Sequence, residues 1–411
     1  MKRRAVITGL GILTPNGNGI DAAWDNLSGG NCAINRITKF DPEDVEGAYA
    51  GEVDVNIMDY IPRRLARKMD PFSAYAIIAC QSAMEDAGLE LEGTNKDRLG
   101  VYVGNTFGGW TFTDPQLRLL HTKGVRGISP FLASAWFPAA PQGQVTIFFQ
   151  LKGQSKTFDS GRASGLASIG YGARAIQTGR ADLMLAGGTE ALVTPYIIAA
   201  CNLEGVADPG HGLAPDGAYK PFDTGRQGWV IGEGAVFLLL EELDHALDRN
   251  ARIYGEITGL GNVTVPCQPR VLPANGEGGL TRSMTNALKD ADLAPGDIDL
   301  IMADALGTVQ GDLQEAGSIN KVFGSTVPVT APKSMSGNLC GAAGAYDTAL
   351  AALSMQHNKA LPTVNLDQQD PGCDIDIVAG APRDISVRNV LVNGRGYGGI
   401  STSLVISAFN G

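Results

Sequence analysis

Short runs of apolar residues, each bounded by glycines or polar turns, recur along the chain with the length of buried β-strands. The clearest runs are LGVYVGN (99–105), ADLMLAGG (181–188), GAVFLLLEEL (234–243), IDLIMADA (298–305) and NVLVNGRGYGG (389–399). Between them lie segments with the pattern of helices, such as 72–88 and 280–293. Strands buried on both faces that alternate with helices are typical of layered proteins, so the pattern predicts the α/β class.

One internal repeat divides the chain. The sequence ITGLG occurs at Ile7–Gly11 and again at Ile257–Gly261, each time after a short apolar run. Each half also contains a turn rich in glycine and alanine that leads into a helix, and small residues allow such helices to pack closely in a core. We therefore predict two duplicated halves, 1–250 and 251–411. The irregular segment 106–145 is interpreted as an insertion that carries binding or interface function.

Composition and charge exclude several classes of function. Hydrophobic residues make up 44% of the 411 residues, charged residues make up 18%, and the net charge is −11. This balance argues against nucleic-acid binding, which depends on clustered Lys and Arg. The apolar start is broken by Thr8, Gly9 and Gly11, which indicates a first strand, and no run of about 18 apolar residues is present. We expect a cytoplasmic protein without a membrane partner.

The cysteines do not suggest a metal site or disulfides. They are scattered without a CxxC pair or any metal-ligand spacing, so buried reduced thiols are expected. A nucleotide cofactor is not indicated either, since Gly9 and Gly11 are followed by Thr14 where GxGxxG needs its third glycine. We expect the chain to bind no cofactor and no metal.

The stretch FDSGRASGLASIG (158–170) has the form of a turn that presents a nucleophile at the start of a helix. Its apex is Arg162, which stays protonated and cannot attack a thioester. Ser160 and Ser164 lie beside the apex.

Several long motifs, in the same order, resemble those of the β-ketoacyl synthases of the thiolase fold. They are ITGLGILTPNG at the start, GGTEA (187–191), PFDTGRQGWVIGEGA (221–235), PKSMSGNLCGAAGA (332–345) and GYGG (396–399). The resemblance implies two mixed five-stranded sheets and buried helices, arranged as a five-layered α-β-α-β-α sandwich of two halves related by a pseudo-twofold axis.

The resemblance also locates a catalytic site. Active members of the family use a cysteine that accepts the acyl chain and two histidines that support decarboxylation of malonyl groups. By position these residues fall on Arg162, on Asp304 in ADALGTVQGD and on Asn338 in KSMSGN. The chain's histidines match none of these motifs and are His121, His211, His245 and His357. We expect no catalytic residue here, but an Arg162–Asp304 ion pair with Asn338 as a third partner.

A second set of motifs is similar to the chain length factors of type II polyketide synthases (PKS). These are YIPRRLARKMDP (60–71), GNTFGGWTFT (104–113), SAWFPAAPQGQVTI (134–147) and MADALGTVQGDLQEA (302–316). The resemblance implies a noncatalytic subunit that forms a heterodimer with an active ketosynthase. The pair encloses an acyl tunnel, and this subunit limits chain length. The partner acyl carrier protein would bring the growing chain on its own phosphopantetheine.

The resemblance also assigns residues to this role. The positions that control chain length fall on Trp110, Thr113 and Leu117, and ordinary interface packing is the alternative role of Trp110. Phe137 falls where the family inserts a side chain across the dimer interface. Tyr397 is expected to be structural. Phe112 is expected to point away from Trp110 along a strand-like alternation.

Two other functions stay open from the sequence. One is a β-ketoacyl-[acyl carrier protein] synthase-like enzyme with residual malonyl decarboxylase or condensing activity. The other is a standalone acyl-binding or assembly protein.

Overall fold

The computed structural model describes residues 3–42, 49–203, 214, 217–266 and 278–409. The strands are β1 (Ala5–Thr14), β2 (Gly17–Asn18), β3 (Ile34–Arg36), β4 (Tyr49–Gly51), β5 (Leu99–Gly104), β6 (Ser155–Phe158), β7 (Leu183–Glu190), β8 (Gly234–Glu242), β9 (Gly255–Thr264), β10 (Leu300–Met302), β11 (Pro328–Thr330), β12 (Lys359–Ala360), β13 (Asp376–Ile377), β14 (Arg383–Asp384), β15 (Asn389–Arg395) and β16 (Ile400–Ser407). The helices are α1 (Ile20–Ser28), α2 (Arg63–Ala66), α3 (Pro71–Asp86), α4 (Trp110–Lys123), α5 (Leu132–Trp136), α6 (Ala140–Phe149), α7 (Ser164–Gln177), α8 (Pro195–Leu203), α9 (Leu243–Asp248), α10 (Gly279–Ala291), α11 (Val309–Phe323) and α12 (Ala343–His357).

Most strands form one mixed sheet, and the order of the strands repeats in its two halves. Over the described residues the path is β13-β11-β10-β15-β16-β9-β1-β8-β7-β5-β6. The order β1-β8-β7-β5-β6 corresponds to β9-β16-β15-β10-β11, and parallel and antiparallel pairs fall at the same places in both. Two expected five-stranded sheets are therefore present as half-sheets. They are joined by β1 and β9 through the pairs Val6–Glu256 and Ile7–Gly255.

The ITGLG repeat is explained by close packing of a strand against a helix. A Cβ atom at Gly9 or Gly11 would lie 2.0 or 1.8 Å from a carbonyl oxygen of α3, and the backbone N–H of Leu10 donates to Asp86 at the end of that helix. Because no side chain fits in this space, both positions require glycine.

The second copy of the repeat packs in the same way against α10. A Cβ atom at Gly259 or Gly261 would lie 2.2 or 1.9 Å from a carbonyl oxygen of that helix, and the N–H of Leu260 donates to Asp290. The same contacts are thus built twice.

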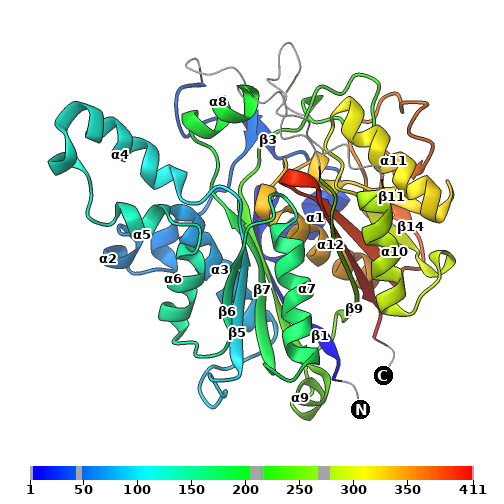
Figure 1. Ribbon diagram of the computed structural model, residues 1–411, viewed down its shortest axis with the longest axis horizontal. Helices are drawn as coiled ribbons and strands as arrows, with labels where there is room; N and C mark the ends of the chain where they lie inside the picture. Colours follow the sequence, from blue (N-terminus) through cyan, green and yellow to red (C-terminus); the bar gives the residue numbers. More distant parts are fainter. Residues whose placement is uncertain (1–2, 43–48, 204–213, 215–216, 267–277, 410–411) are drawn as a thin grey trace.

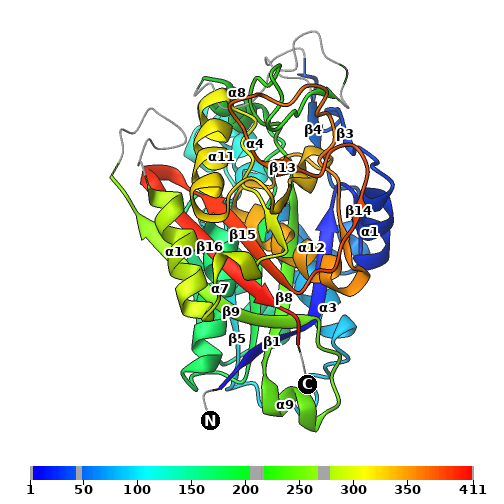
Figure 2. The same ribbon diagram turned by 90° about the vertical axis from the view of Figure 1, so that its right-hand side faces the viewer.

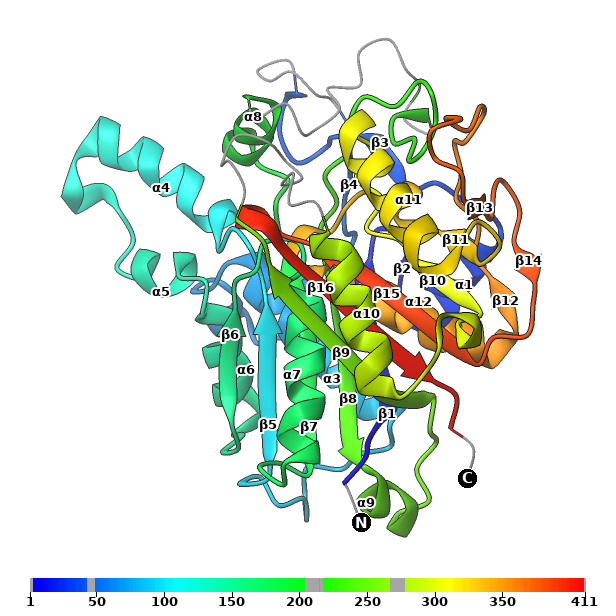
Figure 3. The same cartoon turned by 45° about the vertical axis from the view of Figure 1, so that its right-hand side comes forward.

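The helices and half-sheets form five layers (Figures 1 and 3). Helices α3 and α6 cover the outer face of the half-sheet that contains β1, while α10 lies over β9, β16 and β15 on the outer face of the other (Figure 2). Helices α7 and α12 contact each other and strands of both half-sheets. The α/β thiolase-like fold predicted from the sequence is confirmed.

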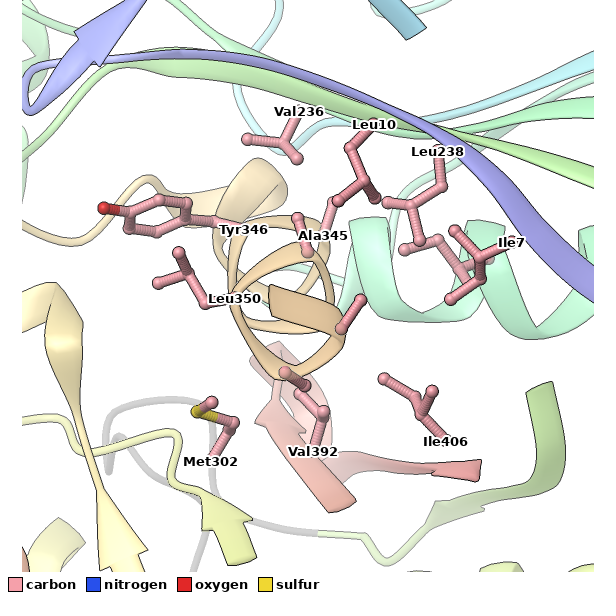
Figure 4. Packing of buried hydrophobic residues seen from close by; sticks show 14 of the residues in the cluster. Ile7, Leu10, Val236, Leu238, Met302, Ala345, Tyr346, Leu350, Val392 and Ile406 are labelled. Carbon is pink, nitrogen blue, oxygen red and sulfur yellow. The ribbon is translucent and has the colours of Figure 1, made fainter. Parts of the chain in front are cut away.

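The central layer is the core of the molecule. Figure 4 shows α12 between two sets of apolar side chains, one from each half-sheet. Ile7, Leu10, Val236 and Leu238 lie on one side of it, and Met302, Val392 and Ile406 lie on the other. This core holds the starts of α7 and α12, and with them the candidate site, in fixed positions.

Segment 106–145 differs from its expected irregular form. Helix α4 begins at Trp110, and α5 and the start of α6 follow it before residue 145. The strand-like alternation expected for Phe112 is wrong, because this residue lies in the first turn of α4.

No described helix has both the length and the apolar character to cross a membrane. Within the described ranges, no group of three or more His, Cys, Asp or Glu side chains is arranged to hold a metal ion. The described cysteines form no disulfide: Cys80, Cys201, Cys340 and Cys373 are buried and Cys32 is half-buried, while Cys267 lies outside the described residues.

Candidate functional site

The predicted nucleophile turn joins β6 to the central helix α7. Gly161 adopts a positive φ of 59°, and the N–H of Ser164 donates to its carbonyl oxygen. The hydroxyl of Ser164 donates to the same oxygen (2.5 Å) and accepts from the N–H of Ser160 (2.8 Å). This hydroxyl therefore holds the turn in shape. The GYGG segment packs against the turn, since a Cβ atom at Gly396 would lie 1.8 Å from the oxygen of Ser160.

Arg162 at the apex is buried without the expected partner. The residue is only 5% exposed, and its Nε and Nη2 atoms have no hydrogen-bond partner among the described residues. The predicted ion pair with Asp304 is wrong, because no charged atoms of these two residues lie within salt-bridge distance. Arg162 acts on Asp304 only through longer-range attraction, which helps to lower the pKa of that carboxyl.

Asp304 is paired instead with Arg395 at the end of β15. The Nε atom of Arg395 donates to Oδ2 of Asp304 (2.8 Å), Nη2 donates to Oε2 of Glu315 (3.0 Å), and Nη1 donates to the carbonyl oxygen of Gly311 (2.8 Å). Glu315 also accepts from the backbone N–H groups of Asp304 (2.8 Å) and Ala305 (2.7 Å). All three charged groups are buried, so they form a closed network of charge-assisted hydrogen bonds.

The network sets the protonation of its members. Burial opposes ionisation of Asp304, but the positive charges of Arg395, Arg162 and Lys333 outweigh it and hold its pKa below the ordinary value. Burial raises the pKa of Glu315 against the opposing charge of Arg395. Asp304 is therefore ionised at neutral pH, and it is present as a carboxylate and not as a proton donor.

Asn338 is held by the backbone and does not reach Arg162. Its N–H donates to the carbonyl oxygen of Val230 (2.7 Å), and its own carbonyl oxygen accepts from Gly232 (2.9 Å). Its Oδ1 atom accepts from the N–H of Cys340 (2.9 Å), at the turn that leads into α12. The Nδ2 atom is buried and has no hydrogen-bond partner within the described ranges, so the expected role of Asn338 as a third partner of the ion pair is also wrong.

Glu190 at the end of β7 is a buried carboxyl beside the same turn. Its Oε1 atom accepts from the backbone N–H groups of Thr106 (2.6 Å) and Gly341 (3.0 Å), and Oε2 has no partner. Burial raises its pKa to about 8 against these hydrogen bonds. At neutral pH Glu190 is therefore mostly protonated and carries little negative charge.

The described histidines lie away from this site. His121 is exposed on α4, His245 pairs with Glu241, and His357 stacks on Trp24 with ring centroids 4.2 Å apart. The fourth, His211, lies outside the described residues. No described histidine can therefore act as a base near Arg162.

The three predicted chain-length residues share one open pocket of about 930 Å³. Trp110, Thr113 and Leu117 recur at the spacing i, i+3, i+7 and so lie on one face of α4. The rest of the lining comes from the chain that follows α4 and from α5, namely Val125, Arg126, Ile128, Ser129, Pro130, Leu132, Ala133 and Trp136. The lining is mainly apolar, as an acyl chain would require.

Helix α4 is anchored at its first turn and extends away from the body of the molecule (Figures 1 and 3). The Trp110 ring stacks on Tyr196 of α8 with centroids 4.2 Å apart and planes 10° apart. The hydroxyl of Thr111 donates to the carbonyl oxygen of Ala191 (3.2 Å). These contacts fix the end of α4 that lies nearest the sheet.

Two other predicted residues lie at the surface. Phe137 follows α5 and is 56% exposed, next to the exposed Trp136. Tyr397 in the GYGG segment is 46% exposed. Neither lies in the pocket lining that contains Trp110.

Sequence reasoning missed Arg395 and Glu315. Both are charged residues within otherwise apolar or glycine-rich motifs, NGRGYGG and MADALGTVQGDLQEA. Arg395 is the one charged residue of β15, and such an isolated charge in a buried strand signals a paired partner elsewhere. Glu315 lies in the helix α11 near another acidic residue, Asp312, so it gave no such signal.

Comparison with known proteins gives the family. The description "Beta-ketoacyl synthase, N-terminal domain" matches residues 2–246, and "Beta-ketoacyl synthase, C-terminal domain" matches residues 254–367. The chain is 38% identical over 410 residues to 3-oxoacyl-[acyl-carrier-protein] synthase 2 of Coxiella burnetii, with 99% of each chain covered. It is 36% identical over 411 residues to the protein of the same name from Staphylococcus aureus N315, again over 99% of each.

Solved structures of related proteins superpose over nearly the whole chain. The ishigamide ketosynthase/chain length factor matches with a TM-score of 0.91 and 30% identity over 100% of both chains. A β-ketoacyl synthase from Burkholderia phymatum STM815 matches with a TM-score of 0.92 and 31% identity, over 99% of this chain and 100% of that one. A type II PKS acyl-carrier protein complex with its ketosynthase, bound to the hexaketide, gives 0.88 and 26% over 100% of both. With both family domains matched and relatives aligned from end to end, the chain belongs to the β-ketoacyl synthase family.

Proposed function

We propose that this chain is a noncatalytic subunit of a type II PKS, of the chain length factor kind, that works as a heterodimer with an active ketosynthase. The observation that carries the proposal is the filling of the three catalytic positions by Arg162, Asp304 and Asn338. None can serve as an acyl-accepting thiol. An ionised Asp304 would repel the enolate that forms on decarboxylation, the reverse of the stabilisation such a step needs.

Neither Ser164 nor Cys340 supplies a substitute nucleophile. The hydroxyl of Ser164 is engaged in the turn itself. Cys340 at the start of α12 is 1% exposed, and burial raises the pKa of its thiol well above the ordinary value. A thiol in that state carries almost no reactive thiolate.

The pocket on α4 supports a role in limiting chain length. Its apolar lining suits a growing acyl chain, and a bulky ring such as Trp110 shortens the space that the chain can occupy. We propose Trp110, Thr113 and Leu117 as the residues that set this limit.

The surface beside the pocket supports a protein partner. Phe137, Trp136 and Ile147 on α5, α6 and the turn between them are 56%, 43% and 70% exposed. Large apolar side chains gathered on neighbouring elements are typical of an interface. We propose that Phe137 contacts the ketosynthase partner. An acyl carrier protein would bring the acyl chain on its phosphopantetheine, as the relative solved with its acyl-carrier protein suggests.

A second candidate function is a 3-oxoacyl-[acyl carrier protein] synthase-like enzyme with residual decarboxylase or condensing activity. The observation in its favour is the 36–38% identity to enzymes of that name.

One experiment separates the two candidates. The purified chain is incubated with malonyl-loaded acyl carrier protein, alone and after co-expression with candidate type II PKS ketosynthases from the same genome. We expect no decarboxylation above background from the chain alone, and co-purification plus carrier-bound products of defined length from the pair. Release of carbon dioxide by the chain alone would favour the enzyme.

The same assay tests the pocket with Trp110→Ala. Removing the indole lengthens the space along α4, so the product should grow by at least one extension unit in mass spectra of the carrier protein. Leu120→Ala is the matched control, since Leu120 lies on the same helix, is 37% exposed and does not line the pocket. An unchanged product from Trp110→Ala would remove Trp110 from this role.

A further inference from the structure

The carboxylate of Asp70 lies between the first turns of two helices. Its Oδ1 atom accepts from the backbone N–H of Phe72 in α3 (3.0 Å), and its Oδ2 atom accepts from the N–H of Phe112 in α4 (2.6 Å). First-turn N–H groups have no partner within their own helix, and the N-terminal end of a helix attracts negative charge. Asp70 is fully buried, so water does not compete for either hydrogen bond.

The start of α4 packs tightly against Asp70. A Cβ atom at Gly109 would lie 2.8 Å from Cβ of Asp70 and 2.2 Å from the carbonyl oxygen of Ala135, so only glycine allows this approach. The N–H of Gly109 donates to the carbonyl oxygen of Trp136 (3.0 Å). Through Asp70, α4 is tied to α3, which packs on β1 and β8 in the core.

Beyond its first turn α4 contacts mainly the chain that follows it, where the Oε1 atom of Gln116 accepts from the N–H of Ser129 (2.7 Å). Thr113 is its one buried residue, and Pro115 within the helix has no N–H to donate. The direction of the helix is therefore set largely at its base. Trp110, Thr113 and Leu117 line the pocket from one face of α4, so a change of that direction would move them together.

We propose that Asp70 is a positioning residue that sets the direction of α4 and thereby the depth of the pocket open to an acyl chain. The geometry stands on the hydrogen bonds above, and the nature of the occupant rests on the proposed function. Asp70 touches no substrate in this proposal and acts through α4.

Protonation of Asp70 should make amide exchange in α4 depend on pH, and a helix cap that does not titrate would not have this effect. Burial raises the pKa of Asp70 to about 7, and the negative charge of Glu233 also raises it. The hydrogen bonds from Phe72 and Phe112 and the positive charge of Lys39 act in the opposite direction. Lys39 is itself paired with Glu233, and the Tyr75 hydroxyl of α3 lies close to Lys39 (3.4 Å). As the pH falls through 7, Asp70 becomes protonated on one oxygen. That oxygen is a weaker hydrogen-bond acceptor than a carboxylate oxygen, so the hydrogen bond that it accepts from one of the two helices weakens.

The test uses Asp70→Ser in the full-length chain, alone and with the ketosynthase partner. Serine can still cap α3 but is too short to reach Phe112, so the melting temperature should stay near the wild-type value while α4 is released. Amide hydrogen exchange over residues 110–117 should rise by on the order of tenfold, as expected for loss of one charge-assisted hydrogen bond. With the partner, longer products should appear.

A matched control removes a helix cap elsewhere. Thr308 caps α11 by accepting from the N–H of Gly311 (3.2 Å) and does not line the pocket. Thr308→Ala should lower the melting temperature without changing exchange in α4 or product length. If Asp70→Ser does not fold, Asp70→Asn keeps the shape and leaves one oxygen for two N–H donors, and the same exchange increase is expected.

The outcomes are distinct. The proposal is overturned if amide exchange in α4 of the Asp70 variants stays at the wild-type rate. It is also overturned if Trp110→Ala lengthens the product while the Asp70 variants leave its length unchanged. If exchange rises but neither variant alters the product, the positioning role holds and the proposed function fails. After correction for intrinsic rates, exchange in wild-type α4 should rise from pH 8 to pH 6, with little change in Asp70→Ser. A flat wild-type profile would contradict control by protonation.

Discussion

Two buried arginines of similar exposure lie in the candidate site, and their hydrogen-bonding capacity is met very differently. Arg395 is 6% exposed and donates from its side chain to Asp304, Glu315 and the backbone of Gly311. Arg162 is 5% exposed, yet in the part of the chain that the structure describes its Nε and Nη2 atoms have no hydrogen-bond partner. Burial of a charge is tolerated when partners surround it and is costly when they do not.

The difference follows from where the partners come from. Arg395 and both of its carboxylate partners belong to the half of the chain that contains β9 to β16, where they form a complete local network. Arg162 belongs to the other half, where Glu190 is mostly protonated at neutral pH. The candidate site is therefore not closed by one ion pair. One part is stably occupied, and the other retains unmet hydrogen-bonding capacity.

Removing the satisfied arginine should have the largest effect. Arg395→Met leaves Asp304 and Glu315 buried without their shared positive charge, and breaking such a network costs about 3–5 kcal/mol. Denaturant unfolding of the purified chain at pH 7 measures the loss. A loss below about 1 kcal/mol would mean that the network contributes no more than a surface ion pair.

Replacing Glu190, which lies in the same half of the chain as Arg162, should have a smaller effect on stability that depends on pH. Its folded-state pKa of about 8 lies above the ordinary glutamate value of about 4.3, so its contribution to stability is present at low pH and is lost as the pH rises through 8. Glu190→Gln keeps an oxygen for Thr106 and Gly341 but does not titrate. The stability of the variant relative to wild type should therefore increase from pH 5 to pH 9 by on the order of 3 kcal/mol. Parallel stability curves for the two proteins would contradict the buried ionisation.

Removing the unsatisfied arginine should have the smallest effect, with the opposite sign to Arg395→Met. Arg162→Met replaces buried unpartnered donors by an apolar chain of similar length, which should raise the free energy of unfolding by about 1–2 kcal/mol. Unfolding at pH 7 of this variant and of Arg395→Met provides the direct comparison. Similar destabilisation by both would show that Arg162 has binding partners equal to those of Arg395.

The sequence predicted the fold well where local pattern decides structure. The apolar runs at 99–105 and 234–243 form β5 and β8, and the helical segment at 72–88 forms α3. The ITGLG repeat indicated the duplication because its glycines report helix–strand contact directly. Segment 106–145 was misjudged as irregular because α4 is largely polar, contains Pro115 and buries only Thr113, so it has no strong apolar stripe.

The candidate site was predicted in part. Motif positions located Arg162, Asp304 and Asn338, but the partner of Asp304 depends on which strands are neighbours. β10 and β15 are parallel and pair Met302 with Val392, so the residues just past these positions, Asp304 and Arg395, emerge side by side. Local sequence does not reveal that pairing across about 90 residues, whereas a register between strands does.

The central pair of helices has an evolutionary consequence. Helix α7 packs on strands of its own half-sheet and also on β9 and β16, and α12 packs on β15 and also on β1, β7 and β8. A single half alone would leave one side of its inner helix exposed, with alanine and leucine in contact with water. The ancestor of the two halves, before its gene was copied and fused, would therefore have needed to assemble as a pair of identical subunits.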